Sequence, residues 1–333
     1  AFRAAYCDDA TQKKYLDIIA NELTEYKYDL QTFEGSKVTP LLDTEFGSSG
    51  LGDEAPLAVE IGSLIKVAPP LRIVFDRRRK HNTLICGSGE RMSENLMNLY
   101  SLAILKNNGA KLYCFDGERL LGPSQADRFY EEYARFGSRF TMADGRGDII
   151  RCINEVYDIY TARKKKNSGD QIFIMIKNLQ FMDIIKSMLK GEPIDESDYL
   201  EDAPVQEVPD DPFDFGMGID TSAMNVSDKL LKLIDDGTAY GIFFIIGSIE
   251  FQSVKECMYF GENTLPKFPE RYVFSLNDSD AESLIENISV KSLKHNTVYY
   301  SDSIKNTFQV KPYVFPSAEE LHIHLNSVIG GNE

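Results

Sequence analysis

The stretch Leu84-Ile85-Cys86-Gly87-Ser88-Gly89-Glu90-Arg91-Met92-Ser93-Glu94 decides the fold of this chain. Three apolar residues lead into a Gly-Ser-Gly turn, and an amphipathic run begins at Asn95. A buried strand, a glycine turn and a helix start together predict a loop that binds phosphate at a helix N-terminus. The sequence therefore predicts an α/β fold with the eight residues from Gly87 to Glu94 as candidate nucleotide contacts.

The side chains of this turn depart from the phosphate-binding pattern G-x-x-x-x-G-K-[ST]. With Gly87 as the first glycine, Met92 replaces the second glycine, Ser93 the lysine, and Glu94 the hydroxyl that holds magnesium. A carboxylate at Glu94 would repel the β- and γ-phosphates. Arg91 could supply a cation, but a guanidinium does not fit a site shaped for an ammonium, and a surface position is favoured. The turn thus predicts a nucleotide fold whose nucleotide chemistry has been lost.

The composition is that of a soluble globular protein. The 333 residues are 43% hydrophobic and 26% charged, enough for one large α/β domain or two small ones. No apolar run approaches the roughly 18 residues of a membrane span, and the first residues do not form a signal peptide. Five separated cysteines without a C-x-x-C, together with four histidines, predict no metal site and a reducing compartment.

The net charge of −16 is concentrated in one segment. Residues 191–228 contain twelve acids and no Lys or Arg, and four prolines interrupt the segment. This composition favours a solvated surface loop over a specific docking site. An acidic body also lacks the positive surface that nucleic acid requires. Two basic runs, 77–80 and 163–166, are interpreted as a solvated turn and a cationic helix C-terminus.

Apolar strand patterns alternate with helical patterns along most of the chain. We expect strands at 71–75, 83–86, 111–116, 171–176, 241–246, 271–276, 297–301 and 307–315. We expect helices at 11–27, 93–107, 124–136, 147–166, 181–190, 226–236 and 317–328. Strands that are apolar on both faces predict a three-layer sandwich with a mainly parallel central sheet flanked by helices.

The order of these elements resembles the FtsK/SpoIIIE family of RecA-like P-loop ATPases. The closest resemblance is to the tandem ATPase modules of type VII secretion motors, over roughly residues 56–316. Its landmarks are Pro56–Gly62, His81–Gly89, Leu230–Ile246, Glu270–Leu276 and Phe308–Tyr313. The resemblance implies an ATPase domain over 56–330, with 191–228 as an inserted loop. It also implies that residues 1–55 continue as strand, helix and linker from a preceding module.

The resemblance also implies altered catalytic positions. Where the family's Walker B strand ends in an acid pair, this chain has Lys177 and Asn178, and neither can act as a base for water. Ser248 is retained from the polar sensor motif after the 241–246 strand, and Ile249 replaces its Gln. We therefore assign no catalytic residue. Glu94 and Lys177 should meet where the family binds magnesium, so an ion pair between them is one hypothesis, and exposure of both to solvent is the other.

The leading interpretation is a degenerate, non-hydrolysing ATPase module with a structural, regulatory or substrate-docking role in a type VII protein secretion motor. Three alternatives are open: a module that retains ATP as a ligand, an active ATP-driven DNA or protein translocase, and an interaction scaffold unconnected to secretion. No cofactor is expected in the leading interpretation, and Mg²⁺ only if ATP binds. The resemblance implies adjacent ATPase modules and a secreted helical-hairpin substrate as partners, and a cytoplasmic domain of a bacterial membrane-anchored protein.

Overall fold

The computed structural model describes residues 8–22, 39–41, 57–66, 68–79, 81–88, 92–124, 126–200, 224–259, 262–290, 293 and 296–329. It divides into two compact units, Ala1–Gly35 and Ser36–Glu333. The described part of the first unit contains helix α1 (Asp9–Glu22), which overlaps the helix expected at 11–27. The strand expected at Phe2–Tyr6 lies outside the described residues. All that follows concerns the second unit.

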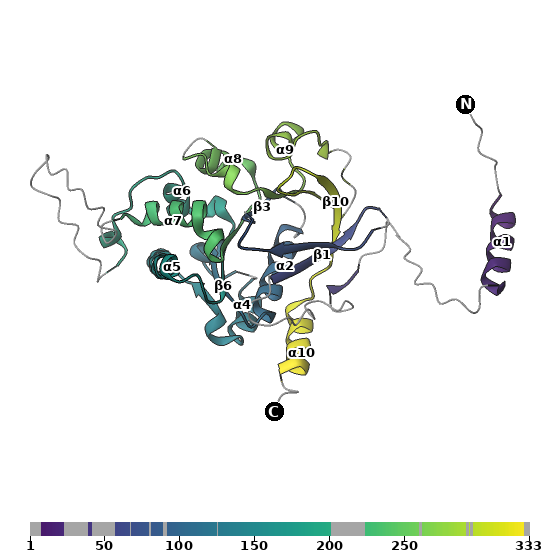
Figure 1. Ribbon diagram of the computed structural model, residues 1–333, viewed down its shortest axis with the longest axis horizontal. Coiled ribbons are helices and arrows are strands. Elements are labelled where there is room, and N and C mark those ends of the chain that lie inside the picture. The colour runs from purple at the N-terminus through teal and green to yellow at the C-terminus, as the bar shows by residue number, and fades with distance from the viewer. Residues whose placement is uncertain are drawn as a thin grey trace, which may run out of the picture. The chain divides into compact units, whose positions relative to one another are not determined.

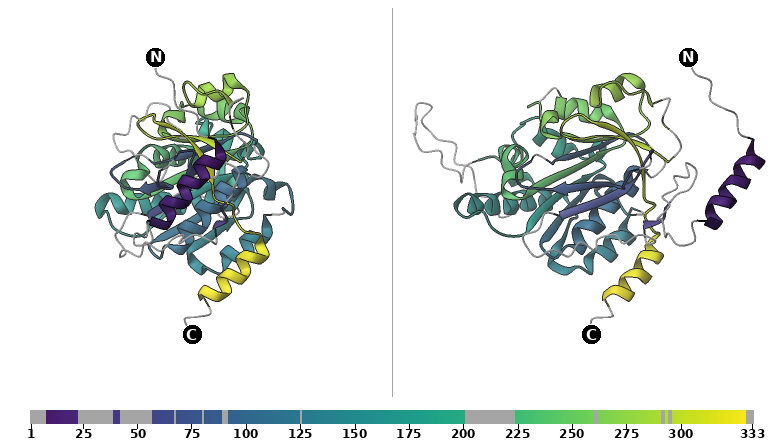
Figure 2. Two further views of the ribbon diagram at one scale, coloured as in Figure 1. Left: turned by 90° about the vertical axis from the view of Figure 1, so that its right-hand side faces the viewer. Right: turned by 45° about the vertical axis from the view of Figure 1, so that its right-hand side comes forward.

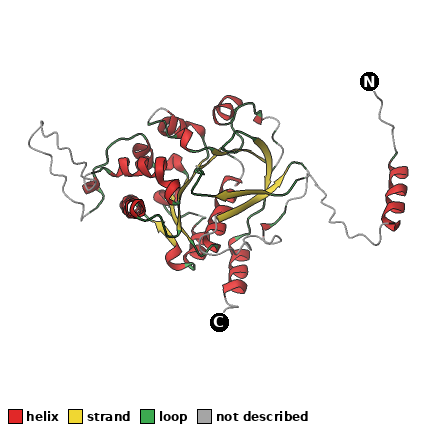
Figure 3. Cartoon of the chain, in the orientation of Figure 1, coloured by secondary structure: helices red, strands yellow, loops and turns green. Residues whose placement is uncertain are grey.

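A ten-stranded sheet forms the centre of the second unit (Figure 1 and Figure 3). Its strands are β1 (Leu57–Leu64), β2 (Leu71–Phe75), β3 (Thr83–Cys86), β4 (Ala110–Asp116), β5 (Phe140–Ala143), β6 (Gln171–Lys177), β7 (Ile242–Ser248), β8 (Glu270–Val273), β9 (Val298–Ser301) and β10 (Thr307–Pro312). They lie in the order β2-β1-β10-β9-β8-β3-β7-β6-β4-β5. The strands from β8 to β5 in that order are parallel, and the other four join by antiparallel pairing. The expected mainly parallel sheet is confirmed.

Helices cover both faces of the sheet, as Figure 2 shows. One face carries α5 (Arg146–Lys165), α6 (Asp183–Leu189), α7 (Val226–Asp236), α8 (Phe251–Val254) and α9 (Asp278–Leu284). The other face carries α2 (Met92–Lys106), α4 (Asp127–Ala134) and α10 (Ala318–Ile329). The short helix α3 (Gly117–Leu121) directly follows β4. The three-layer α/β architecture expected from the sequence is therefore confirmed.

Alternation along the central strands assigns their side chains to the two faces. In β6, Ile172, Ile174 and Ile176 pack with one set of helices, while Phe173 and Met175 pack with the other. All five of these residues are at most 1% exposed. A strand buried on both faces requires apolar residues at every position, which is why these parallel strands appear in the sequence as continuous apolar runs.

Four elements were not expected from the sequence: strand β5 and the short helices α3, α8 and α9. Strand β5 has four residues, and its first three are only partly buried, so it shows no apolar run. Helix α9 has the sequence Asp-Ser-Asp-Ala-Glu-Ser-Leu, which carries too few apolar residues for a clear helical period. In the acidic segment, residues Glu196–Asp198 form a short 3-10 helix and α7 begins at Val226. Residues 201–223 lie outside the described part of the chain.

Candidate functional site

A pocket of about 260 Å³ opens at the carboxyl ends of β3, β4, β6 and β7. In open parallel sheets, ligands bind at this edge, where neighbouring connections leave in different directions. The residues around the pocket come from four strand ends, from the first two turns of α2, from the first turn of α3 and from the residue before α4. They are Gly87, Ser88, Ser93, Glu94, Met97, Asp116, Glu118, Ala126, Lys177, Asn178, Gly247 and Ile249.

The glycine turn after β3 forms one wall of this pocket. Gly87 has a φ of +118°, and a Cβ placed there would lie 3.1 Å from the backbone carbon of Phe274. Only glycine adopts this conformation without strain. The Gly87 N–H donates to the Ser248 carbonyl at 3.0 Å, and the Ser88 hydroxyl donates to the Ser275 carbonyl at 3.3 Å. The turn is thereby fixed to both strands that flank β3.

The other residues of the turn divide into two groups. Gly89, Glu90 and Arg91 lie outside the described residues. Met92 begins α2 and packs against the core, while Ser93 and Glu94 line the pocket from the first turn of the helix. The N-terminus of α2 therefore faces the pocket with a carboxylate in its first turn.

Lys177 extends from the end of β6 into a buried polar environment. The residue is 4% exposed, and its ammonium donates to the Tyr130 hydroxyl at 3.0 Å. The same ammonium lies 5.0 Å from the centre of the Tyr130 ring, within the range of a cation–π contact. Tyr130 in turn donates a short hydrogen bond to Asp116 Oδ2. One tyrosine hydroxyl thus connects the ammonium to a buried carboxylate.

The sheet register brings these charges together. Asp116 ends β4 and pairs directly with Lys177 at the end of β6. Asp116 is 1% exposed, and its Oδ1 accepts from the Glu118 N–H at 3.0 Å and from the Asn178 amide at 2.9 Å. Three donors therefore satisfy this carboxylate, as burial of a charge requires.

The hypothesis of an ion pair between Glu94 and Lys177 is wrong. Both residues line the pocket, but neither takes part in an ion pair within the part of the chain that the structure describes. The alternative, that both side chains point to solvent, also fails for Lys177, which is buried. Register and helix packing place Tyr130 and Asp116 beside the ammonium instead.

A second set of hydrogen bonds continues along the same edge of the sheet. Asn178 has a left-handed backbone with φ of 57°, and its side-chain oxygen accepts from the Gln180 amide at 3.3 Å. The Gln180 oxygen accepts from the Ser248 hydroxyl and from the Ile249 N–H, each at 3.3 Å. Gln180 thus joins Asn178, which follows β6, to Ser248 at the end of β7. Asn178 also donates to Asp116 at the end of β4, so polar groups at three strand ends bind one another.

Burial determines the protonation of the nearby hydroxyl and thiol groups. Burial, together with the adjacent Asp116 carboxylate, raises the pKa of Tyr130 well above its ordinary value. Tyr130 therefore stays protonated and keeps its donor for Asp116. Burial likewise raises the pKa of the Cys86 thiol, so this cysteine is an inert core residue.

A larger pocket, of about 510 Å³, lies between α9 and the turn that joins β9 to β10. Arg271 lines this pocket and donates to the backbone carbonyls of Leu265, Phe268 and Leu284. These bonds tie the start of β8 to the end of α9. We therefore interpret Arg271 as a structural residue.

The sequence analysis missed Asp116, Tyr130 and Gln180. Asp116 could have been found from the sequence, because a charged residue at the end of an expected strand is a candidate for the ligand edge of the sheet. Tyr130 lies on a helix expected at 124–136, and nothing in its sequence surroundings shows that its hydroxyl reaches the sheet edge. Among the described residues, no group of three or more His, Cys, Asp or Glu side chains could hold a metal ion.

No protein-family model matches this sequence, and no curated protein matches it. Solved structures do match its fold. ATPases 2 and 3 of Thermomonospora curvata EccC, solved with a signal sequence peptide, align with a TM-score of 0.59 at 12% identity, over 94% of this chain and 50% of that one. EssC (ATPases 2 and 3) from Geobacillus thermodenitrificans aligns with a TM-score of 0.53 at 12% identity, over 91% of this chain and 53% of that one.

A third similar structure is the conjugation coupling protein TcpA of pCW3, in its monomer form with ATPγS. It aligns with a TM-score of 0.57 at 12% identity, over 96% of this chain and 87% of that one. The chain spans about half the length of the EccC and EssC structures. These similarities show that the chain has the fold that the EccC, EssC and TcpA structures share. Within the described residues, no helix has the length and apolarity to cross a bilayer.

Proposed function

We propose that this chain is a RecA-like module that does not hydrolyse ATP and that has a structural, regulatory or substrate-docking role in a type VII secretion motor. The observation that carries the proposal is the buried Lys177–Tyr130–Asp116 connection at the pocket. Hydrolysis needs a carboxylate that polarises water and a second oxygen ligand for magnesium. Here the end of β6 supplies an ammonium, and the nearest buried carboxylate already accepts from three donors.

The pocket residues do not fit a magnesium nucleotide. Magnesium takes hard oxygen ligands in octahedral geometry, and the Lys177 ammonium has no lone pair to offer. Glu94 adds a negative charge on the first turn of α2, where the phosphates would lie against the helix N-terminus. We therefore derive no catalytic step that passes through a metal or a nucleotide.

The test is thermal unfolding of the chain with and without millimolar Mg-ATP, together with a phosphate-release assay. We expect no change in Tm and no phosphate release above the buffer background. A ligand at about 100 times its Kd would stabilise the chain by about 2.7 kcal/mol, which is a shift of a few degrees. Phosphate release that disappears in Gly87→Ala would refute the proposal.

A second candidate is a module that retains a nucleotide as a ligand without hydrolysis. The observation that favours it is that Gly87, Ser88 and the start of α2 line one pocket together with the Lys177 ammonium. A Tm increase with ATP in EDTA, lost in Lys177→Met, would support this candidate over the first. A Tm increase that depends on magnesium would also contradict the first candidate, and phosphate release above background would contradict both.

The proposed partners follow from the similar structures. The EccC and EssC structures contain more than one ATPase, and one of them was solved with a signal sequence peptide. We accordingly propose that this module contacts adjacent ATPase modules of a longer chain and receives a small helical-hairpin substrate. The module would then be a cytoplasmic domain, attached to the membrane only through that longer chain. Titration of the chain with a labelled substrate tail tests the docking role directly.

A further inference from the structure

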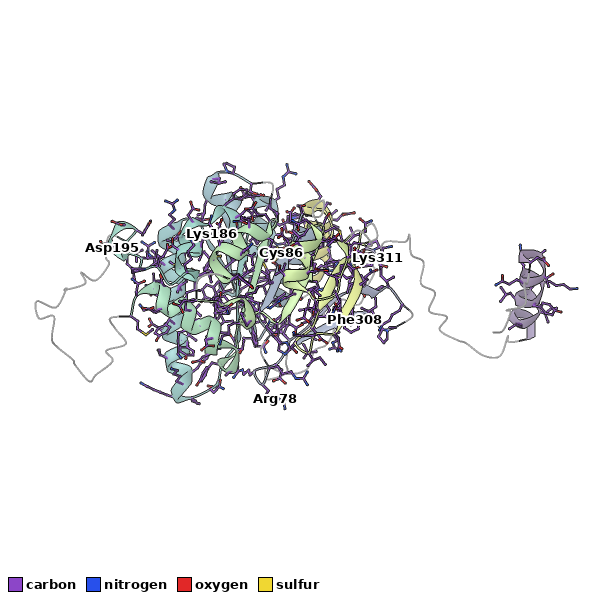
Figure 4. The ribbon with its side chains drawn as sticks, turned by 90° about the horizontal axis from the view of Figure 1, so that it is seen from above. Arg78, Cys86, Lys186, Asp195, Phe308 and Lys311 are labelled. Carbon is purple, nitrogen blue, oxygen red and sulfur yellow. The ribbon has the colours of Figure 1, made fainter. Side chains whose placement is uncertain are left out.

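The pocket of about 510 Å³ beside α9, here called the α9 pocket, has the size of a small-molecule site, which is typically about 300–1,000 Å³. Strand residues Arg271, Ser301 and Thr307 line it together with residues 282–287 at the end of α9. It shares no lining residue with the pocket at the glycine turn. Figure 4 labels Phe308, which follows Thr307, apart from Cys86 at the end of β3. The α9 pocket is therefore a separate site.

Strand register places three polar side chains in one row on the floor of this pocket. Arg271 of β8 pairs directly with Ser301 of β9, and Ser301 pairs with Thr307 of β10. Directly opposed residues project from the same face of a sheet, with Cβ atoms about 4.5–5.5 Å apart. Val273 and Tyr299, two positions further along β8 and back along β9, pack in the core on the face that α9 covers. The row therefore faces α9 across the pocket.

This row has hydrogen-bond donors that the protein does not use. Ser301 is 7% exposed, and its hydroxyl forms no hydrogen bond within the described chain. Buried hydroxyls are normally paired, so this one indicates a missing partner. The three backbone bonds of Arg271 use three of its five N–H groups, and among the described residues Arg271 forms no ion pair. A guanidinium beside a free hydroxyl indicates a carboxylate ligand.

The rim of the pocket carries carboxylates that require a positive charge on the ligand as well. Glu286 pairs with Lys305 at 2.6 Å. Glu282 and Asp302 also line the pocket, and neither forms an ion pair with a described residue. Two uncompensated carboxylates repel a ligand that carries only negative charge. Since no acidic group in the described chain could hold a metal ion, the cation that fits this rim is an organic ammonium.

The remaining wall of the pocket is apolar. It consists of Pro266 and Pro269 before β8 and of Leu284 and Ile285 at the end of α9. Leu284 is 3% exposed and Ile285 is 2% exposed, so both are fixed in the core. Apolar side chains that border a pocket favour an aliphatic ligand group, because its contact with them removes both from water. The pocket thus offers three kinds of contact: donors, carboxylates and an apolar wall.

We propose that the α9 pocket binds a free α-amino acid with an aliphatic side chain. Its carboxylate accepts from Arg271, Ser301 and Thr307, and its ammonium faces Glu282 and Asp302. Its side chain contacts the apolar wall. An α-amino acid carries both charges on a small body, which matches donors on the floor and carboxylates on the rim. The site is independent of the nucleotide question, because the two pockets have no residue in common.

The experiment is equilibrium dialysis of the chain against radiolabelled L-leucine. We expect saturable binding, and Ser301→Ala should weaken it by about tenfold or more, since a hydrogen bond to a charged group is lost. Glu282→Gln should weaken it by about threefold, because this carboxylate is exposed. Ser301→Ala should keep the Tm of the parent, because the hydroxyl that it removes has no protein partner. A loss of affinity with unchanged Tm therefore reports on the ligand.

Two competitors test the need for both charges. N-acetyl-L-leucine lacks the ammonium and resembles the C-terminus of a peptide, and isoamylamine lacks the carboxylate. Each should compete with L-leucine about tenfold more weakly than unlabelled L-leucine does. Equal competition by N-acetyl-L-leucine would overturn the proposal in favour of a peptide C-terminus. Equal competition by isoamylamine would overturn it in favour of a simple cation site.

The matched control is Glu131→Gln, at an exposed position of α4 outside the pocket. It makes the same change in net charge as Glu282→Gln and should bind L-leucine as the parent does. Absence of saturable binding up to about 10 mM L-leucine overturns the proposal, since even a Kd of about 1 mM would be detected. An unchanged affinity in Ser301→Ala overturns it as well. None of these results depends on whether the chain binds Mg-ATP.

Discussion

The substitution Tyr130→Phe tests the interaction on which the proposed function rests. It removes the hydroxyl that accepts from the Lys177 ammonium and donates to Asp116, and it keeps the ring in place. Lys177 then lies buried without its acceptor, while Asp116 keeps two of its three donors. Hydrogen bonds to charged groups contribute about 1.5–3 kcal/mol each, so we expect a loss of about 3–5 kcal/mol in the free energy of unfolding.

A double-mutant cycle separates this interaction from general packing. Lys177→Met removes the ammonium but keeps an unbranched side chain. In the double variant, loss of the Tyr130 hydroxyl no longer leaves a buried ammonium without an acceptor. We therefore expect the two substitutions to be coupled by about 1.5–3 kcal/mol. Urea unfolding followed by circular dichroism measures all four proteins, and an unchanged m-value shows that the denatured states are comparable.

Tyr133→Phe is the matched control. Tyr133 lies one turn further along α4 and is 1% exposed, and its hydroxyl has no hydrogen-bond partner among the described residues. Its loss should change the free energy of unfolding by less than about 1 kcal/mol, or should stabilise the fold. The reasoning is refuted if Tyr130→Phe costs no more than Tyr133→Phe, or if the cycle gives a coupling near zero.

Two further predictions concern the fold. Gly87→Ala should lower the free energy of unfolding by about 1–3 kcal/mol, because the residue has a φ of +118° and an added Cβ would lie 3.1 Å from Phe274. Urea unfolding measures this loss, and an unchanged stability would contradict the backbone geometry. Burial raises the pKa of eight tyrosines: Tyr100, Tyr113, Tyr130, Tyr133, Tyr160, Tyr272, Tyr300 and Tyr313. These tyrosines ionise near pH 10 only in the unfolded chain. Their contribution to the free energy of unfolding is therefore complete below pH 10 and decreases above it, by up to about 1.4 kcal/mol per tyrosine at pH 11. Tyrosinate absorbance of the folded chain should therefore stay below that of all 17 tyrosines, and the remainder should appear together with the loss of circular dichroism between about pH 10 and 11. Ionisation of all 17 tyrosines with the fold intact would contradict the burial.

Much of the fold could be predicted from the sequence because its signals are local. The apolar runs of β6 and β7 and the glycine turn at Gly87 predict buried parallel strands and a ligand edge without any knowledge of their neighbours. The elements that the sequence missed, which are β5, α3, α8 and α9, are short and only partly apolar. Their structure depends on the neighbours that they pack against.

The sequence also indicated that Lys177, Asn178 and Ser248 lie at strand ends, and all three lie at the same edge of the sheet. It could not indicate what Lys177 binds. That depends on the register that pairs β4 with β6 and on the position of α4, which brings Tyr130 across 47 residues of sequence. The hypothesis of an ion pair between Lys177 and Glu94 was wrong for this reason. The Lys177 ammonium donates to the Tyr130 hydroxyl of α4 and not to the Glu94 carboxylate in the first turn of α2.

The sequence by itself thus determined the layered α/β fold and the glycine turn that follows β3. Only the tertiary structure decided which polar groups pair, and that the turn after β2 lies against the segment that follows α5. Strand formation and glycine turns follow from side chains close in sequence. Charge pairing depends on strand order, register and helix packing, which join residues far apart in the chain.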